Sequence, residues 1–115
     1  MKVQILDYNP DWPSQFQAEQ AQLSEALSSW HCQIEHVGST SVPGLAAKPV
    51  LEILIGVPHE DDLDAAAFGL LRMGYHYIRY YERIMPERRY LIKVDAPADA
   101  ELPAIVDSEV NTIDQ

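Results

Sequence analysis

Cysteine, basic residues and long apolar runs are all scarce in this sequence of 115 residues, and each scarcity excludes a class of protein. Cys32 is the single cysteine, so no intrachain disulfide can form, which favours a reducing compartment such as the cytoplasm. No apolar run approaches the roughly 20 residues that a membrane helix needs. The first residues lack the apolar region of a signal peptide. We therefore expect a cytoplasmic protein with no membrane anchor.

Basic residues are outnumbered, with 8 Lys and Arg against 18 Asp and Glu, which gives a formal net charge of −10. A chain this acidic repels polyanions, so nucleic acid is disfavoured as a partner. Six of the 8 basic residues lie between residues 72 and 93. An anionic ligand would be attracted to this segment, although its arginines could equally pair with carboxylates elsewhere in the chain.

The remaining composition is that of an ordinary globular domain, with 47% hydrophobic and 23% charged residues. Disorder and coiled coil fit poorly, and the length suits one folding unit. Alternating and helical apolar patterns predict strands and helices in the order strand, helix, strand, strand, helix, strand, strand. The predicted ranges are strand 3–6, helix 11–28 with Asp11 as its N-cap, strand 32–37, strand 50–57, helix 60–73 with Gly74 as its C-cap, strand 75–81 and strand 89–94, followed by one weak apolar run, Leu102–Val106. This order predicts an α+β fold, a mixed β-sheet with two helices packed on one face.

In the first helix the predicted buried face is Phe16, Leu23, Leu27 and Trp30, and the residues predicted to face water are Gln15, Gln17, Glu19, Gln22 and Glu25. In the second helix the predicted buried stripe is Leu63, Ala66, Ala67, Leu70 and Leu71.

The polar loop after the second predicted strand is the most informative segment. Gly38 lets a ligand approach the backbone, and Ser39, Thr40 and Ser41 add three hydroxyl groups. Lys48 supplies a positive charge for a bound phosphate. The same residues are also ordinary turn formers, so the loop by itself leaves a phosphate site and a plain turn both open.

The four histidines have no metal-site spacing, and the single cysteine offers no second thiolate ligand. His36 neighbours Glu35, but alternation along a strand points the two side chains to opposite faces, so they do not form a catalytic pair. We expect His36 to be a structural, hydrogen-bonded histidine.

The block from Glu35 to Pro49 resembles the signature of the GrpB-like (UPF0157) family. Supporting motifs stand in the expected order: Asp7-Tyr8, Asp11-Trp12-Pro13, Gly74-Tyr75 and Pro86-Glu87-Arg88-Arg89-Tyr90. The resemblance covers about residues 1–93. It implies a nucleotidyltransferase-like fold, in which Val37-Gly38-Ser39 precedes a strand with acids at alternate positions. It also implies a nucleotide or phosphorylated small molecule as ligand, bound by Gly38, Ser39, Thr40, Ser41, Lys48, Arg88 and Arg89.

The resemblance makes Glu52 the candidate catalytic residue and metal ligand, with Mg²⁺ as the possible cofactor. Two divalent cations in such a site need several carboxylate oxygens from neighbouring strands. The second acid of the pattern is replaced by Leu54, and Asp95 is the candidate for a third. We therefore expect a degenerate metal site and weak or absent nucleotidyl transfer, which leaves open whether the protein is an enzyme.

The last residues depart from the family pattern, which continues with further motifs that are missing here. We predict a GrpB-like nucleotidyltransferase-type domain over residues 1–95, truncated relative to the family, and a divergent acidic tail over 96–115. Missing cover on the sheet would expose apolar surface and favour a homo-oligomer. The alternative function is therefore a non-catalytic interaction or folding-assistance module that acts as an oligomer. The family domain also occurs fused to dephospho-coenzyme A kinases, which suits such an accessory role.

Overall fold

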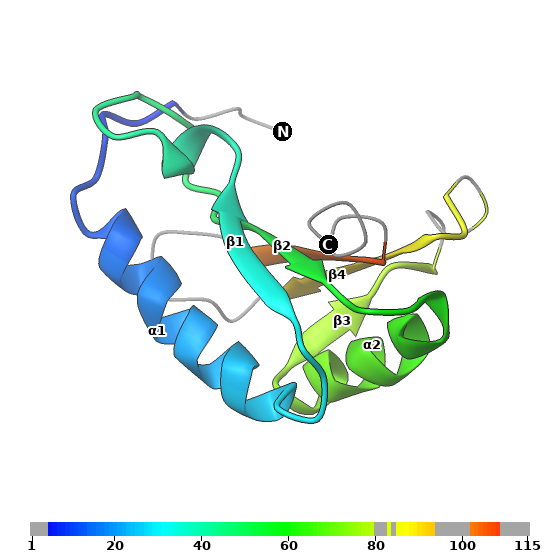
Figure 1. Cartoon of the computed structure of the whole chain (residues 1–115). Helices are drawn as coiled ribbons and strands as arrows, with labels where there is room; N and C mark the ends of the chain where they lie inside the picture. The colour runs from blue at the N-terminus through cyan, green and yellow to red at the C-terminus, as the bar shows by residue number, and fades with distance from the viewer. Residues whose placement is uncertain (1–4, 80–82, 84, 94–101, 109–115) are drawn as a thin grey trace.

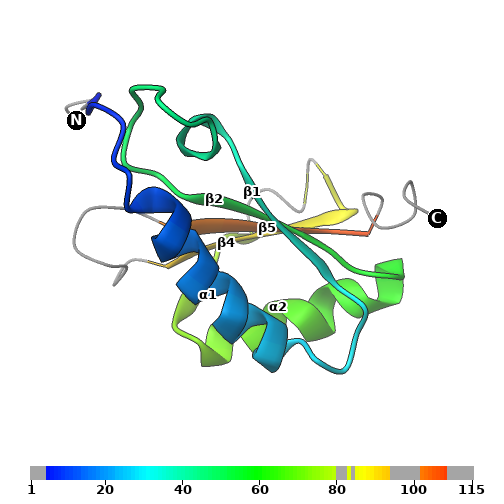
Figure 2. The same ribbon diagram turned by 60° about the vertical axis from the view of Figure 1, so that its left-hand side comes forward.

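A five-stranded sheet with two helices on one face forms the fold in the computed structural model of the chain, which describes residues 5–79, 83, 85–93 and 102–108 (Figure 1). The helices are α1 (Trp12–Ala26) and α2 (Leu63–Arg72), and the strands are β1 (Gln33–Val37), β2 (Glu52–Gly56), β3 (Tyr75–Tyr77), β4 (Arg88–Lys93) and β5 (Leu102–Asp107). Short 3₁₀ turns, η1 (Ser39–Ser41) and η2 (Glu60–Asp62), follow β1 and precede α2. The predicted α+β class, with a mixed sheet and both helices on one face, is confirmed (Figure 2).

The strand order is β1-β2-β5-β4-β3, and β2 and β5 form the one parallel pair among the described strands. Residues 102–107 therefore occupy the centre of the sheet, so for these residues the prediction of a divergent tail over 96–115, outside the domain, is wrong. Positions 96–101 and 109–115 lie outside the described residues. The apolar side chains Leu102, Ala104 and Val106 are fully buried between the sheet and the helices. Burial of this strand, which the local pattern only weakly indicated, depends on partners on both sides of it.

Helix α1 begins after Asp11, as predicted, and has a proline in its first turn. Phe16, Leu23 and Leu27 pack into the core, but the helix ends at Ala26, two residues earlier than predicted. The prediction that Glu19 faces water, together with other polar residues of this helix, is wrong. Its side chain is only 6% exposed, because it lies on the same helical face as Phe16 and Leu23.

Helix α2 buries Leu63, Ala66, Ala67 and Leu70, as the periodicity predicts. Leu71 departs from the predicted buried stripe and is 39% exposed, and Phe68 on the same helix is 54% exposed. Gly74, with φ of +98°, turns the chain from the helix into β3, in agreement with its predicted role at the end of the helix.

The predicted first strand, 3–6, is reduced to a bridge between Leu6 and Ala47 in the described residues, and positions 1–4 lie outside them. Two backbone hydrogen bonds of 2.9 Å join these residues. The bridge ties the segment before α1 to the loop between β1 and β2 and so brings Ile5 close to that loop. No helix within the described ranges is long and apolar enough to cross a membrane.

Candidate functional site

The chain turns sharply where β1 ends, and Glu52 lies against that turn. Gly38 has φ of +79° and ψ of −172°, a conformation that is essentially restricted to glycine. Glu52 begins β2 directly opposite Val37. A Cβ atom added to Gly38 would lie 2.7 Å from Oε2 of Glu52, so glycine is required both for the backbone conformation and for the close approach of the carboxylate.

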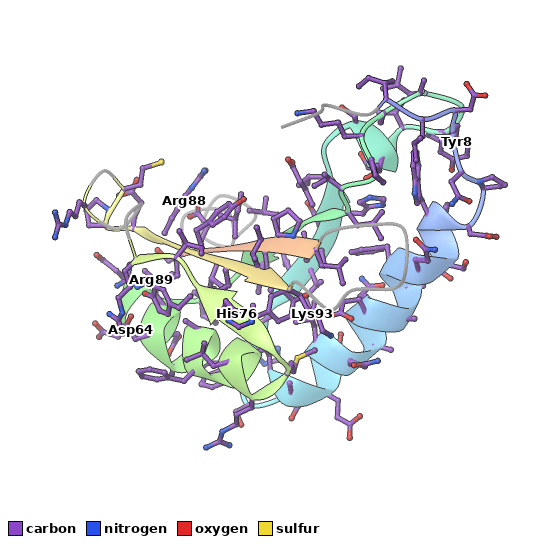
Figure 3. The ribbon with its side chains drawn as sticks, turned by 180° about the vertical axis from the view of Figure 1, so that it is seen from behind. Tyr8, Asp64, His76, Arg88, Arg89 and Lys93 are labelled. Carbon is purple, nitrogen blue, oxygen red and sulfur yellow. The ribbon has the colours of Figure 1, made fainter. Side chains whose placement is uncertain are left out.

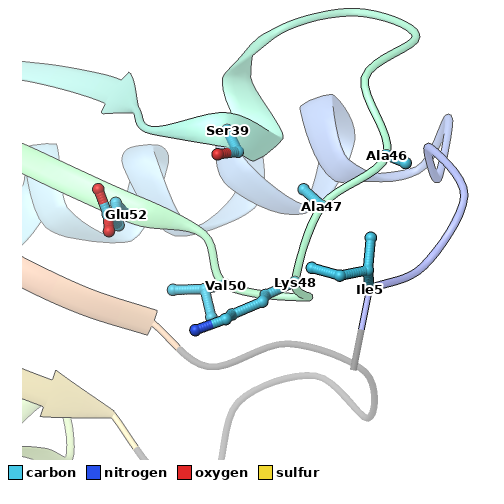
Figure 4. Close-up of a pocket in the computed structure, with 7 residues that line it drawn as sticks. All are labelled: Ile5, Ser39, Ala46, Ala47, Lys48, Val50 and Glu52. Carbon is cyan, nitrogen blue, oxygen red and sulfur yellow. The ribbon is translucent and has the colours of Figure 1, made fainter. Parts of the chain in front are cut away.

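A cavity of about 390 Å³ opens at this corner (Figure 4). Ser39, Lys48 and Glu52 are its polar lining residues, and the other lining residues are apolar. The lining residues are Ile5, Ser39, Ala46, Ala47, Lys48, Val50 and Glu52. Within the described part of the chain, no hydrogen bond or ion pair engages the side chains of Ser39, Lys48 or Glu52. A hydroxyl, an ammonium and a carboxylate are therefore available to a ligand at one place.

The other two hydroxyls of the loop are used within the protein. Ser41 donates a 2.6 Å hydrogen bond to the carbonyl of Gly38. Thr40 is 2% exposed and donates a 2.7 Å hydrogen bond to the carbonyl of Val50. Of the three hydroxyls predicted to bind phosphate, the structure thus turns Ser39 alone to the cavity, while Thr40 and Ser41 stabilise the loop that carries it.

His36 connects this loop to helix α1 through a hydrogen bond and a ring contact. Its Nε2 lies 2.9 Å from Oγ1 of Thr40, and its ring stacks on Phe16 with centroids 4.9 Å apart. Because the single hydroxyl proton of Thr40 goes to Val50, Nε2 of His36 must carry the proton and donate to Thr40. The prediction of a structural, hydrogen-bonded histidine is confirmed. Burial lowers the pKa of His36 below its ordinary value of 6.5.

This lowered pKa predicts a loss of stability in mild acid. Below pH 6.5 the unfolded chain binds a proton at this position more readily than the folded protein, so acidification favours unfolding. The free energy of unfolding, measured by urea denaturation, should fall between about pH 7.5 and pH 5 by more in the wild type than in His36→Gln. His59→Gln, which removes an exposed imidazole, is the matched control. Parallel profiles for wild type and His36→Gln would contradict the prediction.

Arg88 and Arg89 were predicted to assist the loop, and the structure places both elsewhere (Figure 3). Arg88 pairs with Asp107, which is in register with Gly56 at the far end of β2 from Glu52. Four residues of strand separate the two positions by roughly 13 Å. Arg89 points to the opposite face of the sheet and pairs with Asp64 of α2 at 2.7 Å. The alternative interpretation, pairing of these arginines with carboxylates, is the one that the structure supports.

The donor set for a metal is small. Leu54 points the same way as Glu52 and has no atom that could bind a cation, and Asp95 lies outside the described residues. Across the residues that the structure describes, no group of three or more His, Cys, Asp or Glu side chains could hold a metal ion. The described residues therefore do not fit a two-cation site.

Sequence reasoning missed the apolar part of the cavity. Ala46, Ala47 and Val50 flank the predicted Lys48 and could have been proposed from proximity alone. Ile5 has no local signal, because the bridge between Leu6 and Ala47 alone brings it to the cavity. The hydrogen bond between His36 and Thr40 could have been proposed from the sequence, because the two residues lie on either side of the sharp Gly38-Ser39 turn.

The fold and the site define a class of protein. It is a small α+β domain in which a Gly-Ser turn follows the first sheet strand and an acidic residue begins the second. A family model described as GrpB protein matches residues 2–110. The chain belongs to the GrpB family.

Relatives extend well beyond the matched region. An UPF0157 protein of Pseudomonas aeruginosa is 37% identical over 92 residues, which are 80% of this chain and 37% of that protein. An UPF0157 protein of Halalkalibacterium halodurans is 41% identical over 73 residues, or 64% of this chain and 37% of that protein. The chain thus spans little more than a third of the length of these relatives.

A solved structure supports the same assignment. The crystal structure of the conserved protein GrpB from Enterococcus faecalis has a TM-score of 0.74 and 32% identity, covering 96% of this chain and 66% of that one. A dephospho-CoA kinase of Mycolicibacterium paratuberculosis is 36% identical over 76 residues, which are 64% of this chain and 19% of the kinase. A similar sequence block therefore occurs within a longer protein that is named as a dephospho-CoA kinase.

Proposed function

We propose that this GrpB-family chain has a nucleotidyltransferase-type fold and binds a nucleotide or a phosphorylated small molecule at the cavity beside Gly38. The observation that supports this most is the convergence of Ser39, Lys48 and Glu52, without partners among the described residues, on one cavity. Lys48 would neutralise phosphate charge and Ser39 would hydrogen-bond a phosphate oxygen. Phosphate binding is the function that this set of groups supports best.

Transfer of a nucleotidyl group is not part of the proposal. That reaction needs divalent cations held by several carboxylates, and Glu52 is the one carboxylate that lines the cavity among the described residues. Glu52 and phosphate oxygens together could hold a single Mg²⁺ ion weakly. The chain is therefore proposed to bind its ligand without an efficient two-metal reaction.

Ligand binding should raise the thermal midpoint. At a hundredfold excess over the dissociation constant a ligand adds about 2.7 kcal/mol, which corresponds to a shift of about 10 °C or more for a domain of this size. ATP, CTP, GTP, UTP and simple phosphate esters should be titrated with and without Mg²⁺ or Mn²⁺. Lys48→Gln and Ser39→Ala should reduce the shift, whereas Arg72→Gln, which removes an exposed arginine on α2, should not.

A second function would remain if no nucleotide, phosphate ester or metal shifts the midpoint: a non-catalytic interaction module that acts as an oligomer. Phe68 and Leu71 favour it, because both are exposed on α2. The similar block in a dephospho-CoA kinase also suits a module that is joined to other activities. In that case size-exclusion chromatography should give a mass above the 13.0 kDa of one chain.

A further inference from the structure

The lining of the cavity indicates which chemical class of ligand it binds, and this inference rests on the phosphate-binding function proposed above. We infer that the ligand is a small phosphate monoester that carries a hydroxyl or ammonium group near its phosphate, in preference to a nucleoside triphosphate. The inference follows from the size of the cavity, from its charge and from the acceptor character of Glu52.

The cavity is small. Its volume of about 390 Å³ lies near the lower end of the roughly 300–1,000 Å³ that ligand pockets usually have. Four of its seven described lining residues are apolar, and the short side chains of the two alanines leave room for a few carbon atoms; the four are Ile5, Ala46, Ala47 and Val50 (Figure 4). The cavity is half open, so a short carbon skeleton would lie among these lining residues, whereas a nucleoside triphosphate would extend past them into solvent.

The charge of the lining is balanced. Lys48 contributes one positive charge and Glu52 one negative charge, and no other charged residue lines the cavity in the described part of the chain. Arg88 and Arg89 are engaged with Asp107 and Asp64 at other places. A phosphate monoester carries about −1.5 to −2 at neutral pH, and a triphosphate carries more, in a protein that is already strongly acidic. A single ammonium therefore suits a single phosphate.

Glu52 determines which functional group the ligand should carry in addition to its phosphate. An ionised carboxylate only accepts hydrogen bonds, and beside a phosphate it would repel the ligand unless the ligand brings a donor. The side chain starts on β2, and its Oε2 lies close to Gly38, where an added Cβ would be at 2.7 Å. A hydroxyl or ammonium group of the ligand would satisfy this carboxylate, while Lys48 and Ser39 bind the phosphate.

Calorimetric or NMR titration with matched compounds tests the class. Phosphoethanolamine and glycerol 3-phosphate carry the donor, ethyl phosphate lacks it, and ATP and inorganic phosphate complete the set. A hydrogen bond to a charged group accounts for about tenfold in affinity or more, so the two donor-bearing esters should bind about tenfold tighter than ethyl phosphate. Glu52→Gln should remove most of this preference, and Glu60→Gln, at an exposed position, should retain it.

The outcomes separate this inference from the function on which it rests. Tighter binding of ATP than of the donor-bearing esters would overturn the inference and leave phosphate binding intact. The same holds if Glu52→Gln leaves the preference unchanged while ethyl phosphate still binds. Failure of every phosphate compound, inorganic phosphate included, to bind would overturn the proposed function and this inference with it.

Discussion

Gly38→Ala should lower the free energy of unfolding by about 2 kcal/mol or more and displace the Glu52 carboxylate from the cavity. A backbone with φ of +79° and ψ of −172° costs a residue with a Cβ about 1–3 kcal/mol. The new Cβ would also lie 2.7 Å from Oε2 and 3.1 Å from Cδ of Glu52, so the carboxylate must move. Urea denaturation measures the first effect, and ligand titration the second.

Gly44→Ala is the control for this substitution. Gly44 also has a positive φ, of +81°, but a Cβ there would meet no atom within 4 Å. Gly44→Ala should therefore lower the free energy of unfolding through backbone strain alone and leave the ligand affinity unchanged. In Gly38→Ala combined with Glu52→Ala, the part of the loss that comes from the contact should disappear. If Glu52→Ala leaves the loss of Gly38→Ala unchanged, the contact contributes nothing to the requirement for glycine.

Lys93→Met should destabilise the protein by about 3–5 kcal/mol, because it leaves the charge of Glu19 buried without its cation. Nζ of Lys93 lies 3.1 Å from Oε2 of Glu19, and the two side chains are 16% and 7% exposed. Tyr75 donates a 2.8 Å hydrogen bond to the same carboxylate. Burial, followed by the charge and hydrogen bond of Glu19, raises the pKa of Tyr75, which keeps its hydroxyl protonated as a donor. A loss this large is a sizeable fraction of the 5–15 kcal/mol typical of a domain.

Two further variants separate a buried pair from a surface pair. Glu19→Met combined with Lys93→Met removes both charges and should recover most of the stability, since an apolar pair can replace a buried ion pair. Asp64→Asn breaks the pair between Arg89 and a carboxylate that is 62% exposed, and should cost about 1 kcal/mol or less. Equal losses for Lys93→Met and Asp64→Asn in urea denaturation would show that the burial of Glu19 and Lys93 has no energetic consequence.

Glu19 shows where a local pattern and residue type conflict. Spacing alone put Glu19 on the buried face of α1, three residues after Phe16 and four before Leu23, but its charge led to the opposite prediction. Its partner Lys93 is 74 residues away in the sequence, so no local pattern could indicate that the charge would be neutralised. The arginines of β4 lie away from the cavity for a similar reason, because strand register and the positions of Asp64 and Asp107 decide where they point.

The sequence by itself determined the two helices, most of the strands and the Gly-Ser corner, because these depend on periodicity and on turn chemistry within a few residues. It also indicated the family and the acid at position 52, through the resemblance of the block from Glu35 to Pro49. Only the tertiary structure decided that residues 102–107 lie at the centre of the sheet, that the Thr40 and Ser41 hydroxyls bond to backbone carbonyls, and that Ile5 completes the cavity. Each of these depends on contacts between segments far apart in the chain, and such contacts are selected by the burial and hydrogen bonding of the whole domain.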